Sequence, residues 1–320
     1  MGWDYYRKEV EPMIDLYLCE DEVADYINRQ KDTILEAIGG LDGSWKHNTI
    51  IQELCEIALK TIHEWEEKSK IDKLATINIG RKTEKYTKWV EVMRLALFQY
   101  ERFTEKRSAK SEALYSTLCS LAQLWGENDI KKIVVPGCGP GRTVLDFARL
   151  YPKAEVLGLD YSLLALILGD GIVCGKDNNK LLQRDVQAGD EISRIYNISG
   201  FGLENAKFGV INLITNQIPK CDMIICSNTL NLLSSQEKVI KGLVESLNVN
   251  GIIVFADLFG WRLDRQPDNR IIYDDISMIK VFEKYGLVTL DCFSGVPYVE
   301  AESGDQFAYY NEHFYVGKRV

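Results

Sequence analysis

The sequence lacks any apolar run of the roughly 20 residues that a membrane span needs. Its first stretch, MGWDYYRKEVEPMIDLYLCEDE, has acids where a secretory signal peptide has a positive start and an apolar core. Position six is Tyr6 and not the Ser or Thr of a myristoylation signal. We therefore expect no membrane partner and a cytoplasmic location.

Metal-binding patterns are also missing. The chain has eight cysteines and three histidines, but no CxxC pair and no short Cys/His cluster. Cys221 and Cys226 stand five residues apart in a predicted strand, so they face opposite sides of it. This usage favours free thiols in a reducing compartment, and we predict no metal site.

Basic stretches are scarce as well. The net charge is −9 at pH 7, which repels phosphate backbones over most of the surface. The best basic stretch, TEKRSAKSE at 104–112, interleaves its cations with glutamates and is typical of a solvated helix face or a linker. The composition therefore argues against nucleic acid as a partner.

Two parts of the chain follow different patterns. Residues 1–126 carry apolar residues at three- and four-residue spacing, as in NTIIQELCEIALKTIHEWEEK, and predict an all-helical N-terminal domain. In residues 127–320 short apolar runs alternate with helical stretches. This alternation predicts an α/β domain with a doubly wound, mostly parallel sheet that is covered on both faces.

Three glycines fill the first predicted strand-to-helix turn, within IVVPGCGPGRTVLDF at 133–147. Gly137, Gly139 and Gly141 permit positive φ and a close ligand, and the following helix offers free N–H groups. The spacing G-x-G-x-G before Arg142 differs from the dinucleotide turn G-x-G-x-x-G, which disfavours a nicotinamide or flavin cofactor. A tight turn without a ligand is the alternative.

Two acids at later positions favour a nucleoside ligand. Asp160 lies near the end of EVLGLDYS, where a carboxylate can accept ribose hydroxyls. Asp185 lies in LLQRDVQ, a candidate strand end, where it can accept from an adenine amino group. Each acid taken alone fits a helix cap or surface position equally well, but together with the glycine turn they favour a nucleoside site.

At these positions the sequence resembles the class I S-adenosylmethionine-dependent methyltransferases over about residues 110–320. VVPGCGPGR, EVLGLDYS, QRDV and CDMIICSNTLNLL are similar to their first four motifs. The resemblance implies a Rossmann-like methyltransferase sheet, with one antiparallel strand in the last pair VTLDCFSG and EHFYVGKR, and S-adenosyl-L-methionine as cofactor. The cofactor-binding residues that it implies are Pro136, Gly137, Cys138, Gly139, Gly141, Arg142, Asp160, Tyr161, Asp185, Val186, Ser227 and Asn228.

One position departs from the family. An acid often stands two residues before the first motif glycine, and this chain has Val135 there. The stretch Pro-Gly-x-Gly-x-Gly-Arg is similar to the carnosine N-methyltransferase-like branch, and Arg142 suits the methionine carboxylate by a charge-assisted bond. The long helical N-terminal region and the ending YYNEHFYVGKR are also similar to that branch.

Methyl transfer from a sulfonium is an in-line displacement, so positioning supplies much of its rate. In the family the turn SNTLNLL faces the transferable methyl, and there Asn228 can orient an acceptor. The carnosine-type branch tends to have an acid at that place, which puts an imidazole acceptor in doubt. Asp257 is a candidate base or a loop-ordering acceptor, and the resemblance favours Tyr310 as the third catalytic candidate.

We infer that the helical N-terminal half is a lid that supplies acceptor specificity, with a stabilising or homodimerising cap as the alternative. Candidate acceptor-binding residues are Asn231, Trp261, Tyr298, His313, Tyr100, Arg102 and Tyr115. Asn231 fits a helix cap and Trp261 a core position equally well. The predicted function is methyl transfer to N or O of a small molecule or peptide. The alternatives are a non-catalytic cofactor-binding scaffold, a protein side-chain or nucleic-acid methyltransferase, and a dinucleotide oxidoreductase.

Overall fold

The computed structural model describes residues 14–39, 49–68, 109–126, 129–175, 178–187, 190–233, 235–258, 271–272, 274–303 and 306–320. Its main sheet contains β1 (Ile14–Tyr17), β2 (Lys132–Pro136), β3 (Glu155–Asp160), β6 (Ala206–Ile211), β7 (Cys221–Ser227), β8 (Leu247–Asp257), β9 (Leu287–Ser303) and β10 (Gln306–Arg319). The helices are α2 (Glu20–Gly39), α3 (Thr49–Lys68), α5 (Ala109–Trp125), α6 (Arg142–Leu150), α7 (Leu163–Val173), α8 (Gln236–Ser246) and α9 (Asp275–Lys284), with a 3-10 turn η2 (Leu230–Leu232).

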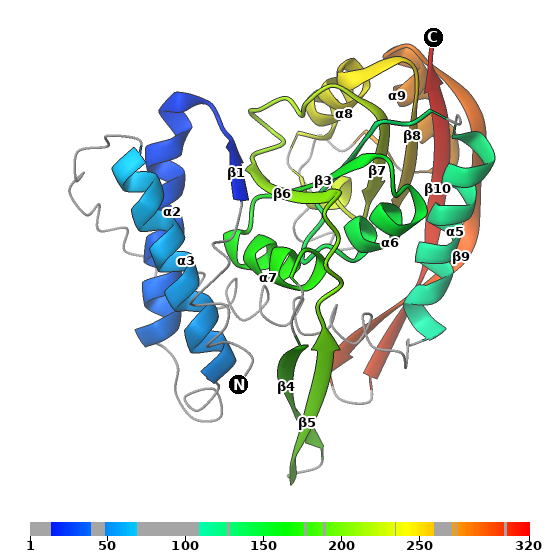
Figure 1. Ribbon diagram of the computed structural model, residues 1–320. Helices are drawn as coiled ribbons and strands as arrows, with labels where there is room; N and C mark the ends of the chain where they lie inside the picture. Colours follow the sequence, from blue (N-terminus) through cyan, green and yellow to red (C-terminus); the bar gives the residue numbers. More distant parts are fainter. Residues whose placement is uncertain are drawn as a thin grey trace.

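The strand order of this eight-stranded sheet is β1-β6-β3-β2-β7-β8-β10-β9 (Figure 1). The first six strands in this order are parallel to their neighbours, and β10 is antiparallel to both β8 and β9. The antiparallel member of the last pair is therefore confirmed. Because parallel strands end on the same side, β2, β3, β6, β7 and β8 finish along one edge, the carboxyl edge, where such sheets bind ligands.

Helices cover both faces of the sheet, and the sequence of β2 shows why. Ile133 and Val135 pack with α5, α6 and α7, whereas Val134 between them packs with α8 and α9. Successive strand residues alternate between faces, so a strand that is apolar throughout has to be buried on both sides. We call the two layers the α5–α7 core and the α8–α9 core.

Phe208 of β6 explains several small residues in the α5–α7 core. A Cβ atom added to Gly141 would lie 2.7 Å from its Cζ, and one added to Gly169 would lie 2.9 Å from its Cε1. A Cβ on Gly158 of β3 would lie 3.1 Å from its Cδ1. The start of α6 and the middle of α7 thus approach the sheet around one aromatic ring.

The strand β1 contradicts the expectation of an all-helical N-terminal domain. It pairs in parallel with β6, and Tyr17 stands opposite Ile211. Gly209 of β6 leaves room for the Tyr17 ring, because an added Cβ would lie 2.4 Å from Tyr17 Cε2. Four residues are too few for periodicity to separate strand from helix, so partner contacts decide the structure here.

The helices of the predicted N-terminal domain pack on the sheet unit in two places. The helices α2 and α3 stand side by side and α3 reaches α7 (Figure 1). The helix α5 packs against β8, β9 and α6. Helices from before residue 126 therefore contribute to the α5–α7 core, and the division of the chain at that residue stays a prediction.

A third motif of the sequence lies outside the main sheet. The strands β4 (Asn178–Gln187) and β5 (Asp190–Ser199) pair with each other in a separate two-stranded sheet. Asp185 and Val186 lie within β4, so their assignment to a strand end of the main sheet is wrong. The place beside β3 belongs to β6, whose sequence AKFGVI has the apolar character of a strand buried on both faces.

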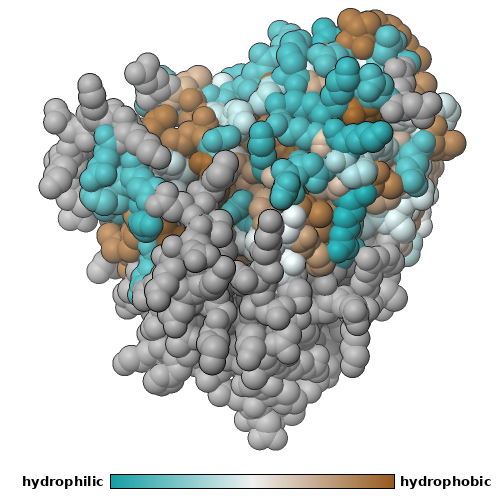
Figure 2. Space-filling model, viewed as in Figure 1, coloured by the Kyte–Doolittle hydropathy of each residue, from teal (hydrophilic) through white to brown (hydrophobic). Residues whose placement is uncertain are grey.

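Two further expectations concern the chain as a whole. All eight cysteines are free thiols, as predicted. In the part of the chain that the structure covers, no helix is long and apolar enough to cross a bilayer, and no three metal-ligating side chains come together. On the face shown in Figure 2, hydrophilic side chains cover much of the described surface and apolar ones lie between them in small groups.

Candidate functional site

The glycine loop, residues 137–141, leads from β2 at the carboxyl edge into α6. Gly137, Gly139 and Gly141 have φ values of 66°, 52° and 86°, a conformation that L side chains rarely adopt. A Cβ on Gly137 would lie 2.1 Å from the Thr229 hydroxyl oxygen. The structure thus has the predicted strand, turn and helix, and the first glycine also makes room for the segment after β7.

Asp160 ends β3 and is joined to the glycine loop by its carboxylate. One oxygen accepts the Gly139 N–H at an N···O distance of 2.8 Å, and the other accepts the Ser162 N–H at 2.9 Å. Burial raises the pKa of Asp160, and the hydrogen bonds from Ser162 and Gly139 oppose that rise. The Tyr161 backbone also hydrogen-bonds to this carboxylate, and its remaining acceptor capacity is available to a ligand hydroxyl.

Asn212 follows β6 at the carboxyl edge, next to the strand that carries Asp160. Its side-chain oxygen accepts the Ile214 N–H at 3.1 Å, and its backbone oxygen accepts the Asn216 N–H at 2.8 Å. From the sequence we expected Asp185 at the end of the strand beside β3 and did not single out Asn212. The apolar run AKFGVI directly before Asn212 is the sequence pattern that could have indicated this strand end.

Asn228 follows β7, the strand on the other side of β2. Its φ is 50°, and among described residues the only other non-glycine residue with positive φ is Asn250. Its N–H donates to the Ala256 carbonyl at 2.9 Å, while its buried side-chain oxygen has no hydrogen-bond partner within the described chain. A strained backbone together with an unsatisfied buried acceptor is typical of a ligand site.

Asp257 ends β8 and holds the η2 turn. Its oxygens accept the Leu258 N–H at 2.8 Å and the Asn231 N–H at 3.2 Å. Burial raises the pKa of Asp257 to about 7, although these backbone hydrogen bonds oppose the rise. The contacts are those of the loop-ordering acceptor, and a role as base stays a prediction.

Asn231 itself is 4% exposed, and neither atom of its side-chain amide has a partner within the described chain. An amide buried without partners costs free energy unless a ligand or water completes its hydrogen bonds. The unsatisfied oxygen of Asn228 and the unsatisfied amide of Asn231 therefore lie after the same strand.

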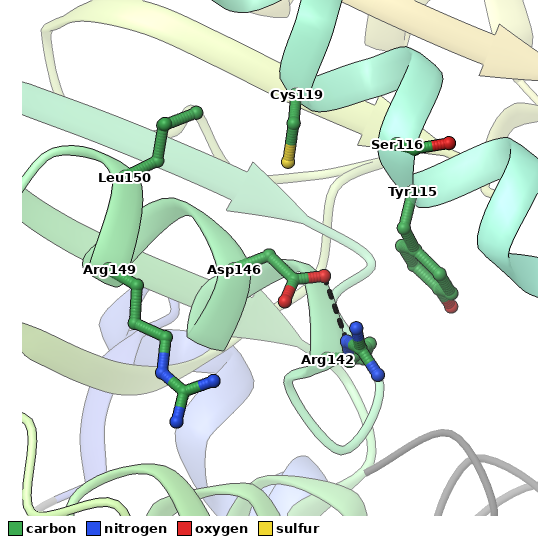
Figure 3. Close-up of a pocket in the computed structure, with 7 residues that line it drawn as sticks. All are labelled: Tyr115, Ser116, Cys119, Arg142, Asp146, Arg149 and Leu150. Atoms are coloured by element: carbon green, nitrogen blue, oxygen red, sulfur yellow. Dashed lines mark hydrogen bonds and ion pairs between the residues drawn. The ribbon is translucent and has the colours of Figure 1, made fainter. Parts of the chain in front are cut away.

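Arg142 is the first residue of α6, is 4% exposed and contacts two neighbouring side chains. Its Nε donates to an Asp146 carboxylate oxygen at 2.8 Å, and its guanidinium lies 5.3 Å from the centre of the Tyr115 ring (Figure 3). Both contacts lie in a groove of about 400 Å³ that α5 and α6 line together. Tyr115 is therefore buried beside Arg142, and its contact with an acceptor stays a prediction.

The C-terminal candidates lie on β9 and β10. His313 stands opposite Asp257 in the β8–β10 register, and its Nδ1 lies 2.6 Å from an Asp275 carboxylate oxygen. Tyr310 and Tyr298 pair with each other where β9 and β10 continue past the end of β8 (Figure 1). That ribbon projects beyond the carboxyl edge. Trp261, Tyr100 and Arg102 lie outside the described residues.

Comparisons with known proteins found distant similarities. No protein-family model matches the chain. An uncharacterized protein of Rickettsia prowazekii (strain Madrid E) is 25% identical over 177 residues, which are 52% of this chain and 28% of the relative. The chain thus spans less than a third of that relative.

Two similar solved structures are described as methyltransferases. A TehB-like SAM-dependent methyltransferase from Corynebacterium glutamicum is 15% identical, with 72% of this chain and 99% of that chain covered and a TM-score of 0.46. The N-methyltransferase NodS from Bradyrhizobium japonicum, in complex with S-adenosyl-L-homocysteine, is 12% identical, with 72% and 97% covered and a TM-score of 0.49. Similarities this distant assign no activity to the chain.

Proposed function

We propose that this chain binds S-adenosyl-L-methionine at the carboxyl edge and transfers its methyl group to N or O of a small molecule or peptide. One observation carries the proposal. The glycine loop, the Asp160 carboxylate and the unsatisfied buried oxygen of Asn228 follow three adjacent strands of one parallel sheet. This is the edge at which doubly wound sheets bind nucleotides.

The residues present fit the cofactor. The glycine loop would bring backbone close to it, Asp160 would accept from the ribose hydroxyls, and Asn212 has an amide for the adenine edge. When bound, the cofactor supplies an electrophilic methyl group on a sulfonium. Arg142 as the partner of the methionine carboxylate remains part of the proposal, with its guanidinium already held by Asp146.

The remaining roles belong to the acceptor. Asn228 would orient it through its unsatisfied side-chain oxygen, and Asn231 through its unsatisfied amide. Asp257, with a pKa of about 7, would take up a proton from an acceptor nitrogen or oxygen near neutral pH. Tyr310 would contact the acceptor from the β9–β10 ribbon.

The proposal is tested with a matched pair of variants. Asp160→Asn should weaken S-adenosyl-L-homocysteine binding by about 1–3 kcal/mol, the range for hydrogen bonds to a charged group, as measured by calorimetry. Asp222→Asn is the control, because Asp222 also accepts two backbone N–H groups, those of Lys131 and Lys132, but at the amino end of the sheet. Equal affinity of both variants and the wild type would remove Asp160 from the site.

A second candidate function is a cofactor-binding scaffold without catalysis. Val135 favours it, because this 2% exposed apolar residue stands where the family often has an acid. Cofactor binding without release of S-adenosyl-L-homocysteine, over a panel of amine, imidazole, phenol and peptide acceptors, would select the scaffold. The same panel should include nucleic-acid acceptors, which we expect not to be methylated because the net charge is −9.

A further inference from the structure

The peptide group between Tyr161 and Ser162 is held at both of its polar ends. Its carbonyl oxygen accepts the Tyr26 hydroxyl of α2 at 3.0 Å, and its N–H donates to Asp160 at 2.9 Å. A peptide group is planar, so the direction of its carbonyl also fixes the direction of its N–H. One rigid unit therefore connects Tyr26 to the Asp160 carboxylate.

Tyr26 is itself fixed in place. It is 2% exposed, its ring meets the Tyr161 ring edge-on with centroids 5.0 Å apart, and the Trp65 ring of α3 lies at 6.4 Å. Burial raises the pKa of Tyr26 well above its usual value, so the hydroxyl stays a neutral donor. Because the group is buried, water does not readily replace its hydrogen bond when the hydroxyl is removed.

The same helix contacts the segment that follows β6. The Asn216 side chain donates to the Glu22 carboxylate at 2.5 Å and accepts from the Cys19 thiol at 2.9 Å. Hydrogen bonds from Thr215 and Asn216 lower the pKa of Glu22, so this carboxylate is ionised at neutral pH. The N-terminal part of α2 therefore contacts the segments that follow β3 and β6, the two strands assigned above to the ribose and the adenine.

We propose that Tyr26 is a positioning residue for the cofactor and acts through the 161–162 peptide group on Asp160. This inference rests on the proposed function. It gives α2 a role on the nucleoside side of the site, in addition to any role as an acceptor lid. A purely structural role for Tyr26 predicts lower stability without a specific loss of nucleoside affinity.

The test compares two tyrosine hydroxyls by calorimetry with S-adenosyl-L-homocysteine. Tyr26→Phe should weaken binding about threefold to tenfold, the effect of one hydrogen bond. Tyr151→Phe is the matched control, since the Tyr151 hydroxyl also donates to a backbone carbonyl, that of Ala122, at 3.0 Å. Tyr151 follows the end of α6 that is opposite the glycine loop, so its removal should change affinity less than about twofold.

A double variant separates positioning from general loosening of the site. If Tyr26 acts through Asp160, adding Tyr26→Phe to Asp160→Asn should weaken binding no further, because effects on one shared contact are not additive. A Tyr26→Phe affinity equal to that of Tyr151→Phe, or an undiminished effect in the double variant, would overturn the inference. If Asp160→Asn already abolishes measurable binding, the comparison of the two single tyrosine variants decides. Absence of binding by the wild type would refute the proposed function itself, before any variant is compared.

Discussion

Asp257 is a fully buried carboxyl group at the end of a central strand, and its environment disfavours its charged form. It is 1% exposed, and burial raises its pKa from 3.8 to about 7. In the unfolded chain the group titrates near its ordinary value, so the folded state holds the proton more tightly. The stabilising effect of this proton is complete below pH 3.8 and is lost as the pH rises to about 7.

We therefore predict that the wild type loses about 2 kcal/mol more unfolding free energy than Asp257→Asn between pH 5 and pH 7. Urea denaturation at fixed pH values measures the difference. Asp222→Asn is the control, because hydrogen bonds from Asn248 and two backbone amides outweigh burial and hold the pKa of Asp222 below its usual value. That group titrates below this window, so Asp222→Asn should keep the wild-type pH slope. Parallel curves for the wild type and Asp257→Asn would show that Asp257 is ionised throughout.

At the scale of elements, local sequence patterns predicted individual turns and helices, but they did not predict which strands pair with each other. The glycine loop and the helix after it follow from residues 133–147 alone, because turn glycines and the helix pattern are local properties. Asp160 was placed correctly at the next strand end. The sequence did not predict β1, nor that β6 and not β4 lies beside β3. The neighbour of a short strand is decided by contacts with residues far away in the sequence. Asn212 was missed together with β6.

The pairing of β1 with β6 gives a prediction of its own. Gly209→Ala would bring a methyl group to within 2.4 Å of Tyr17 and should lower the unfolding free energy by about 1–3 kcal/mol, as overpacking does. Gly242→Ala is the control, because nothing lies within 4 Å of its added Cβ and it sits inside α8. That control should be neutral or stabilising by up to about 1 kcal/mol. Denaturation of both variants measures this, and a Gly209→Ala protein as stable as the wild type would mean that Tyr17 does not pack there.

At the scale of the molecule, the N-terminal helices and the sheet share one core. Ile27 and Ile34 of α2 and Ile62 of α3 belong to the same buried cluster as Ile133 of β2 and Phe208 of β6. A continuous apolar cluster of this kind favours unfolding in a single cooperative transition. It also connects α2 and α3, which we call the helical hairpin, to the strands that end at the carboxyl edge.

This shared core predicts the effect of a cavity in α2. Ile34→Ala, at a fully buried position, should destabilise the whole chain by about 2–5 kcal/mol and shift one common transition seen by circular dichroism and tryptophan fluorescence. Leu35→Ala, at the neighbouring position that is 49% exposed, should change stability by less than about 0.5 kcal/mol. Two separate transitions in the Ile34→Ala protein would show instead that the hairpin unfolds by itself.

The distribution of exposed and buried thiols has a practical consequence for measuring cofactor binding. Of the eight cysteines only Cys19 is exposed, and burial raises the pKa of Cys138 in the glycine loop well above its usual value. Thiolate is the reactive form, so a maleimide dye should attach first at Cys19 and spare the loop. A fluorophore there would sit beside Asn216, at the junction of α2 with the segment after β6. Its emission should therefore report cofactor binding without an engineered cysteine.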